Sequence, residues 1–225
     1  MFGIESLLVV TVVMPLAAAV LTALLGPRLL RSQSHWPTLV ALAISLAASL
    51  VLVWQVWKES GQAHLAGQQE PISPPYAQPH PLGYERIITL WTWTGSPSPA
   101  SSSPTGLTSS PRATDGSNRP ADPLGPRPLI EVALRADPLT AMMLATVLAV
   151  SLLVAVYSVG YMHGDPGYWR FYSYIALFVF SMCMLVSVSN FLLLYVFWDA
   201  VGLCSYLLIG FWYQRPAAAA AGKKA

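Results

Sequence analysis

Five apolar segments, each about 20 residues long, constrain this chain more than any other feature of its sequence. About 20 helical residues cross the hydrocarbon core of a bilayer, because a helix rises about 1.5 Å per residue. Only a helix or a closed barrel satisfies its own backbone polar groups in lipid. We therefore predict an all-α polytopic membrane protein with five transmembrane helices, at residues 6–26, 37–57, 138–162, 171–188 and 191–212.

The charge content agrees with this class of protein. Only 10% of the residues are charged and the mean hydropathy is +0.53, whereas soluble domains carry about 25% charged residues. The net charge of +2 and the absence of a long basic patch argue against a nucleic-acid partner. Cys183 and Cys204 lie in apolar runs without metal-ligand spacing, so we predict no metal site. Glu5, which precedes a long first apolar run without a basic n-region, favours a retained helix over a signal peptide.

The short loops predict the orientation of the helices. Basic residues concentrate on one side of the predicted membrane, at Arg28, Arg31, Arg170, Arg215, Lys223 and Lys224. The positive-inside rule then places the N-terminus outside and the C-terminal tail in the cytoplasm, or in the matrix of an organelle.

The long segment at residues 58–137 is predicted to lie on the outer side. Residues 86–94, RIITLWTWT, and residues 129–136, LIEVALRA, have the β-branched and aromatic content of hairpin strands. Between them, residues 96–128 are dominated by proline and serine and have little to bury. We expect a small extramembrane β-hairpin that carries a disordered insertion.

Asp199 stands near the middle of the fifth apolar segment. It follows Asn190 by nine residues, which places it about 13 Å into the membrane. A carboxylate at this depth costs about 2.5–3.5 kcal/mol on insertion scales and usually marks an ion pathway or a proton relay. A structural alternative is an aspartate that hydrogen-bonds to a nearby tyrosine or carbonyl and fixes helix packing.

The neighbours of Asp199 at helical spacing form a partly polar stripe. Tyr195, Gly202 and Tyr206 share its face, together with Leu203 and Gly210. Small and polar residues are typical of contacts between membrane helices. We therefore expect Asp199 to point into a protein interior, while the opposite face meets lipid or apolar neighbours.

No cation of this chain is placed to pair with Asp199. The central turns of the five predicted helices contain no Lys, Arg or His. Either Asp199 is protonated or its cation comes from another polypeptide segment. The same inventory lacks a bis-histidine haem site, a nucleotide-binding glycine loop and a catalytic triad or carboxylate pair. We therefore expect no cofactor in this chain.

Long stretches of the sequence resemble the subunit L, or chain 5, family of NADH-quinone oxidoreductases. The resemblance is carried by LLLYVFWDAVGLCSYLLIGFWYQRP, YSVGYMHGDPGYWRFYSYIALFVFSM, ADPLTAMML and LWTWT. It covers roughly residues 84–95 and 128–225, and the first two helices more loosely. The family consists of antiporter-like membrane subunits with more than a dozen helices, thought to move protons while electron transfer occurs elsewhere in the complex.

The resemblance implies a role for Asp199. The family carries glutamate after the tryptophan of this motif, paired with a lysine on a later helix, and Trp198–Asp199 occupy those positions here. Asp199 is then the midplane proton carrier, supported by Tyr195, Gly202 and Tyr206. Lys224 corresponds weakly to a family lysine; it is also explained as an anchor on the cytoplasmic side. NADH, flavin, iron–sulfur clusters and quinone are expected in partner subunits.

Three departures from the family pattern stand out. Aspartate is one methylene shorter than glutamate, which implies a longer or water-bridged contact with a lysine. The proline and serine insertion enlarges a hairpin that is short in the family. The sequence also ends at PAAAAAGKKA, where family members continue, so we interpret it as an N-terminal fragment. We expect it to have no redox site and to be inactive by itself, and to belong to an enzyme only as part of the complex.

The predicted organisation has four parts. Residues 1–57 form two N-terminal transmembrane helices, and residues 58–137 form the outer segment. Residues 138–188 form helices three and four, which belong to a chain 5 N-terminal domain that begins near residue 128. Residues 189–225 form helix five and the truncated start of the transporter domain.

The expected partners are other membrane subunits of the respiratory complex, the lipid bilayer and protons. The function that the resemblance implies is that of a proton-translocating membrane subunit of NADH:quinone oxidoreductase, which couples electron transfer in other subunits to proton pumping. Two alternatives are the equivalent subunit of a cation/proton antiporter or membrane-bound hydrogenase, and an inactive membrane fragment.

Overall fold

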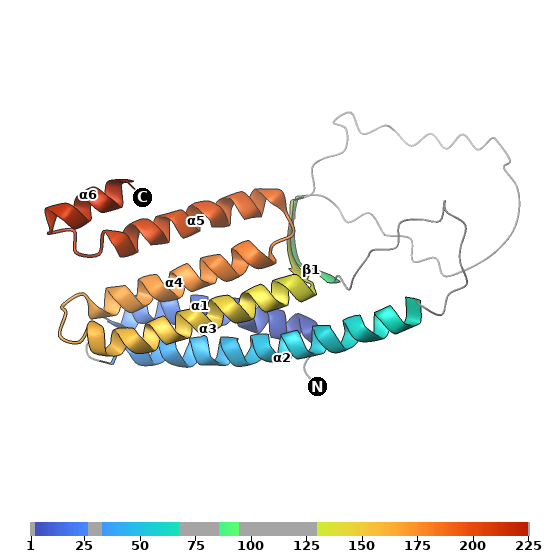
Figure 1. The fold of residues 1–225 in the computed structure, drawn as a ribbon. Helices are drawn as coiled ribbons and strands as arrows, with labels where there is room; N and C mark the ends of the chain where they lie inside the picture. Colours follow the sequence, from blue (N-terminus) through green and yellow to red (C-terminus); the bar gives the residue numbers. More distant parts are fainter. Residues whose placement is uncertain (1–2, 27–32, 68–85, 95–129, 225) are drawn as a thin grey trace, which may run out of the picture.

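The computed structural model describes residues 3–26, 33–67, 86–94 and 130–224. Within these ranges the chain forms six helices and two strands (Figure 1). In chain order they are α1 (Ile4–Leu25), α2 (His35–Gly67), β1 (Arg86–Thr94), β2 (Ile130–Ala136), α3 (Pro138–Tyr161), α4 (Tyr168–Ser187), α5 (Phe191–Ile209) and α6 (Pro216–Lys224).

Five of these helices, α1 to α5, are long and apolar enough to cross a membrane. The predicted all-α fold with five such helices and a small hairpin is confirmed. The main difference is in α2, which was predicted to end at Trp57 but continues to Gly67. Charges at Lys58 and Glu59 mark the end of the apolar stretch, but they do not stop a helix, because both residues have good helix propensity.

Helices α1 to α4 pack into one unit with a shared apolar core. Helix α1 packs against α2 and α4, and α3 packs against α2 and α4. The core includes side chains from all four, such as Leu8, Leu42, Leu148 and Tyr172, which are fully buried. Helix α5 lies along the outside of this unit and packs mainly on α4 (Figure 1).

Small hydroxyl side chains are buried where these four helices meet. The hydroxyl groups of Thr22 on α1 and Thr38 on α2 lie 3.4 Å apart. The Ser173 hydroxyl on α4 donates to the carbonyl of Ala19 on α1 at 3.2 Å. Hydroxyl groups bonded across or within helices are a usual way to satisfy polar atoms and bring backbones close in a membrane protein.

The hairpin closes one end of the helical unit. Strands β1 and β2 pair antiparallel, with Arg86 opposite Ala136, so the predicted strand at residues 86–94 is confirmed. The second strand, predicted at residues 129–136, is described from Ile130 to Ala136. The backbone N–H of Ser189, just before α5, donates to the Ala133 carbonyl of β2 at 3.1 Å. The predicted disordered insertion at residues 96–128 lies outside the described residues.

The start of α3 follows directly from β2. The Asp137 carboxylate accepts a hydrogen bond from the backbone N–H of Thr140 at 2.7 Å, which caps the helix, and Pro138 occupies its first turn. The carboxylate of Asp137 also lies 3.6 Å from the guanidinium of Arg135. The hairpin therefore fixes the residue at which α3 begins.

The two ends of the bundle differ in charge. The N-terminus, the end of α2 and the hairpin lie at one end, and the α3–α4 and α5–α6 connections lie at the other (Figure 1). Among the described residues, that second end carries Arg170, Arg215, Lys223 and Lys224. Helix α6, predicted only as a tail, folds back along α5, where Gly222 packs against Gly210.

Candidate functional site

Asp199 lies in the middle of α5 and at the surface of the described chain. The helix begins after Asn190, whose side-chain oxygen accepts a hydrogen bond from the backbone N–H of Leu192 at 2.9 Å. Asp199 is the ninth residue of the helix, so the predicted depth of about 13 Å agrees with the helix as it is formed. Its side chain is exposed.

The stripe predicted around Asp199 is present on one face of α5. Tyr195, Gly202 and Tyr206 are all exposed, with Tyr195 at 60% and Tyr206 at 48%. The other face packs on the bundle: the ring of Phe197 meets that of Phe180 edge to face at 5.8 Å, and Cys204 is buried. The protein interior that we expected around Asp199 is therefore not supplied by the described residues, and a role for the stripe stays a prediction.

Helix α6 reaches this stripe only at the C-terminal end of α5. A Cβ at Gly222 would lie 3.4 Å from the Cα of Gly210 and 3.7 Å from the ring of Tyr206. A cavity of about 260 Å³ between α4, α5 and α6 is lined by Tyr206 and Lys223, among others. Lys224, the weaker of the sequence predictions, is exposed at the end of α6. Within the described chain no ion pair joins it to Asp199, so the structure does not bring these two residues together.

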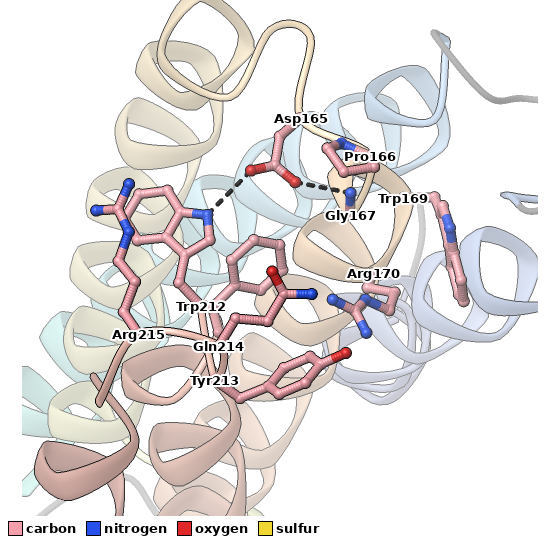
Figure 2. Close-up of a pocket in the computed structure, with 10 residues that line it drawn as sticks. Asp165, Pro166, Gly167, Trp169, Arg170, Trp212, Tyr213, Gln214 and Arg215 are labelled. Atoms are coloured by element: carbon pink, nitrogen blue, oxygen red, sulfur yellow. Dashed lines mark hydrogen bonds between the residues drawn. The ribbon is translucent and has the colours of Figure 1, made fainter. Parts of the chain in front are cut away.

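A second group of polar side chains lies where the α3–α4 turn meets the α5–α6 turn (Figure 2). One oxygen of Asp165 accepts a hydrogen bond from the indole N–H of Trp212 at 2.9 Å, and the other accepts from the backbone N–H of Gly167 at 2.7 Å. The guanidinium groups of Arg170 and Arg215 lie beside them. Both arginines entered the sequence-based predictions only through the positive-inside rule. The sequence did contain a sign of this cluster, because aromatic residues lie close to both arginines in the chain, in YWRF and WYQR.

A third polar cluster is buried at the start of α4. The hydroxyl of Tyr168 lies 3.0 Å from Nδ1 of His35, and the hydroxyl of Tyr172 donates to the Ala155 carbonyl at 3.2 Å. The rings of Tyr168 and Tyr172 are 4.9 Å apart. These bonds tie α2, α3 and α4 together, so the cluster is explained by packing. In the ranges that the structure describes, no three His, Cys, Asp or Glu side chains are grouped as metal ligands.

Comparisons with known proteins match this chain to one family. Residues 129–172 match the family described as NADH-ubiquinone oxidoreductase (complex I), chain 5 N-terminus. Residues 188–225 match the family described as NADH:quinone oxidoreductase/Mrp antiporter, TM. The two matches cover β2, α3 and the start of α4, and then α5 and α6.

Individual relatives give the same assignment. NADH-quinone oxidoreductase subunit L of Neisseria meningitidis is 32% identical over 98% of this chain and 25% of its own length. Chain 5 of the NAD(P)H-quinone oxidoreductase of Synechocystis is 54% identical over 43% of this chain and 14% of its own length. The chloroplast subunit 5 of Mesostigma viride is 56% identical over 43% of this chain and 15% of its own length.

The chain thus spans about a quarter or less of the length of these relatives. The two family matches together include both the hairpin strand β2 and the Asp199 motif on α5. The resemblance that the sequence motifs indicated is confirmed. This multi-pass integral membrane chain belongs to the chain 5, or subunit L, family of NADH-quinone oxidoreductases.

Proposed function

We propose that this chain forms the first helices of a proton-translocating membrane subunit of an NADH:quinone oxidoreductase. The observation that carries the proposal is Asp199, a carboxylate nine residues into a helix that contains no other charged residue. Acids in such positions are costly and usually take part in ion or proton movement. In this proposal, electron transfer takes place in other subunits of the complex. It drives the movement of protons through the membrane subunit of which this chain is a part.

The exposed face of α5 supports a proton carrier that works against a group outside the described chain. Asp199, Tyr195 and Tyr206 lie on that face, and the helix reaches the bundle only through its other side. The relatives are several times longer. We infer that further helices of the complete subunit cover this stripe and bring a lysine opposite Asp199, as the resemblance implies.

The neighbouring residues have supporting roles in this proposal. Gly202 has no atom within 4 Å of a Cβ built on it, so a second helix has room to approach α5 there. Tyr195 and Tyr206 lie on the same face of α5, one turn before and two turns after Asp199, and in this proposal they help to keep that face hydrated. Lys224 is assigned in this proposal only as an anchor at the membrane surface.

The redox chemistry belongs to other subunits in this proposal. NADH, flavin, iron–sulfur clusters and quinone would be bound there, and other membrane subunits of the complex would be the partners of this chain. The four described basic residues at the α6 end support an N-terminus outside a bacterial inner membrane and a C-terminal tail in the cytoplasm.

A cation/proton antiporter subunit is the second candidate. The family matched by residues 188–225 includes Mrp antiporters as well as quinone oxidoreductases. The two candidates share the proton step at Asp199 and differ in what drives it. A dependence of proton movement on NADH would favour the oxidoreductase, and a dependence on a sodium gradient would favour the antiporter.

The test compares Asp199→Asn with Asp199→Glu in the complete complex. Proton uptake into inverted membrane vesicles is measured per NADH oxidised, together with NADH oxidation by an artificial acceptor that bypasses the membrane subunits. Asparagine should lower the ratio of protons to NADH and leave the artificial reaction unchanged, because it cannot ionise. Glutamate, which keeps the carboxylate, should retain proton uptake. Unchanged proton uptake with asparagine would exclude Asp199 as a carrier.

A further inference from the structure

The cluster at the α6 end of the bundle surrounds an open cavity of about 590 Å³ (Figure 2). It is formed by the turn between α3 and α4, the first residues of α4, and the turn between α5 and α6. The lining side chains with polar or charged groups are those of Asp165, Trp169, Arg170, Trp212, Tyr213, Gln214 and Arg215.

The two arginines of this cavity are held by aromatic rings. The guanidinium carbon of Arg170 lies 5.6 Å from the ring centroid of Phe211 and 6.0 Å from that of Tyr213. The guanidinium carbon of Arg215 lies 5.0 Å from the ring of Trp212. Stacking of this kind holds the flat guanidinium group while its N–H edge stays able to donate hydrogen bonds. Neither arginine has an ion pair among the residues that the structure describes.

The acidic residue of the cavity is already engaged. Both carboxylate oxygens of Asp165 accept hydrogen bonds, one from Trp212 and one from Gly167. The lining carries two arginines and one aspartate, a formal charge of +2 − 1 = +1. The charge and the two planar donors suit a phosphate group, because guanidinium groups bind phosphate oxygens through paired N–H bonds.

The cavity lies at the depth of lipid headgroups. Helix α4 begins at Tyr168 and α5 ends at Ile209, and the lining residues follow or precede these points by only a few positions. Phe211, which is 8% exposed, forms part of an apolar wall, and Trp212 and Tyr213 are the residue types that gather at membrane interfaces. A phosphate bound here could carry acyl chains that continue along the helices.

We propose that this cavity binds the phosphate group of an anionic phospholipid in the leaflet on the α6 side. Basic pockets between membrane helices on the cytoplasmic side are a known form of lipid site. Arg170 on α4 and Arg215 after α5 lie on opposite sides of Trp212 and Gln214 (Figure 2), so each offers a separate donor group at which the phosphate binds. The proposal does not depend on Asp199.

The experiment uses the purified complex with the complete subunit in phosphatidylcholine nanodiscs. A phosphatidylglycerol probe with a photoreactive group next to its phosphate is added, and labelled peptides are mapped by mass spectrometry. Labelling should concentrate at residues 165–170 and 211–215. The double variant R170Q/R215Q should reduce it about 30-fold, because each basic residue near an anionic surface contributes about a factor of five. R170K/R215K should show a smaller loss, because it keeps the charge but loses the planar fork.

Two controls identify the ligand. R135Q is the matched variant, because Arg135 lies in the hairpin at the opposite end and pairs with Asp137, and it should leave labelling of the cavity unchanged. A phosphatidylcholine probe with the same reactive group should label these peptides only weakly.

Equal labelling by the two lipid probes, or labelling that survives R170Q/R215Q, would overturn the proposal. If inorganic phosphate displaces the probe completely, the ligand is free phosphate and the lipid assignment is wrong. If the double variant fails to assemble, the comparison of the two probes on the unmodified complex decides the question alone.

Discussion

Helices α1 to α4 and helix α5 are built from similar apolar sequences but stand in different surroundings. Between 28% and 44% of the spanning residues of α1 to α4 are buried, against 6% for α5. Yet α5 is more apolar than α4. In a bilayer, lipid is as apolar as a leucine side chain, so hydropathy shows that a helix enters the membrane and not what it packs against.

The difference lies in the kind of side chain that each region exposes. The four-helix unit buries its hydroxyl groups between helices, as at Thr22 and Thr38, and exposes mostly aliphatic residues. Helix α5 exposes Tyr195, Trp198, Asp199 and Tyr206 on its free side. Helix α5 therefore leaves a partly polar face uncovered by the described residues, and we proposed above that further helices pack on it.

The largest expected effect on stability is the difference between replacing a buried leucine and replacing an exposed leucine of α3. Leu148→Ala should lower stability by about 2–4 kcal/mol, because Leu148 is fully buried among the four helices and its loss leaves a cavity. Leu153→Ala, on the same helix but 70% exposed, is the matched control and should cost far less. Heating the purified subunit with a fluorescent maleimide reports unfolding through the buried Cys183 and Cys204. Equal losses for the two variants would contradict a packed four-helix unit.

A glycine inside the packed unit should be the next most sensitive position. A Cβ at Gly26 would lie 2.8 Å from the Cβ of Trp169, so Gly26→Ala forces α1 and α4 apart and should cost about 1–3 kcal/mol. The same maleimide assay measures this loss. Gly160→Ala on α3, where no atom lies within 4 Å of the added Cβ, is the control without a clash.

The hydrogen bond that ties α5 to the α3–α4 turn should have a smaller effect. Trp212→Phe removes the indole N–H that donates to Asp165 and should cost about 1 kcal/mol, the usual contribution of one hydrogen bond. Trp198→Phe, which changes an exposed tryptophan in the middle of α5, should leave the unfolding temperature of the 225-residue chain unchanged. No difference between the two variants would mean that the turn is held by its ring contacts alone.

The smallest effect is expected on the free face of α5. Gly202→Ala should raise the stability of the 225-residue chain by less than about 1 kcal/mol, because nothing lies within 4 Å and alanine favours a helix. Measured in the complete subunit, the same variant tests whether the face is covered. A loss of stability there, with none in the short chain, would locate a helix that packs against Gly202.

Most of the fold could be predicted because hydrophobic length and strand composition are local signals. The hairpin strand at Arg86–Thr94 and the starts of α3 and α5 were placed to the residue. The last ten residues of α2 were missed because the apolar stretch ends at the predicted membrane boundary, whereas the helix continues beyond it. Helix α6 was missed although its sequence, a proline followed by five alanines, has a favourable first residue and high helix propensity.

The candidate site was predicted only in part. Periodicity gives the residues that share a face, so the grouping of Asp199 with Tyr195, Gly202 and Tyr206 holds on the observed helix. Periodicity does not show which face of α5 meets the bundle, because that depends on the position of α4 in space. The cavity lined by Arg170 and Arg215 could be found only from the fold, because the two arginines are 45 positions apart in the sequence.

The bond between Ser189 and Ala133 has a consequence for how this chain responds to membrane thickness. Because β2 runs straight into α3 and also holds the residue before α5, these two helices start from one shared anchor. The 19 residues of α5 extend about 28 Å, close to the hydrocarbon thickness of about 30 Å. In a thicker bilayer α5 cannot shift independently of α3, so the lipid must thin around both helices. In a thinner bilayer the two helices must tilt together.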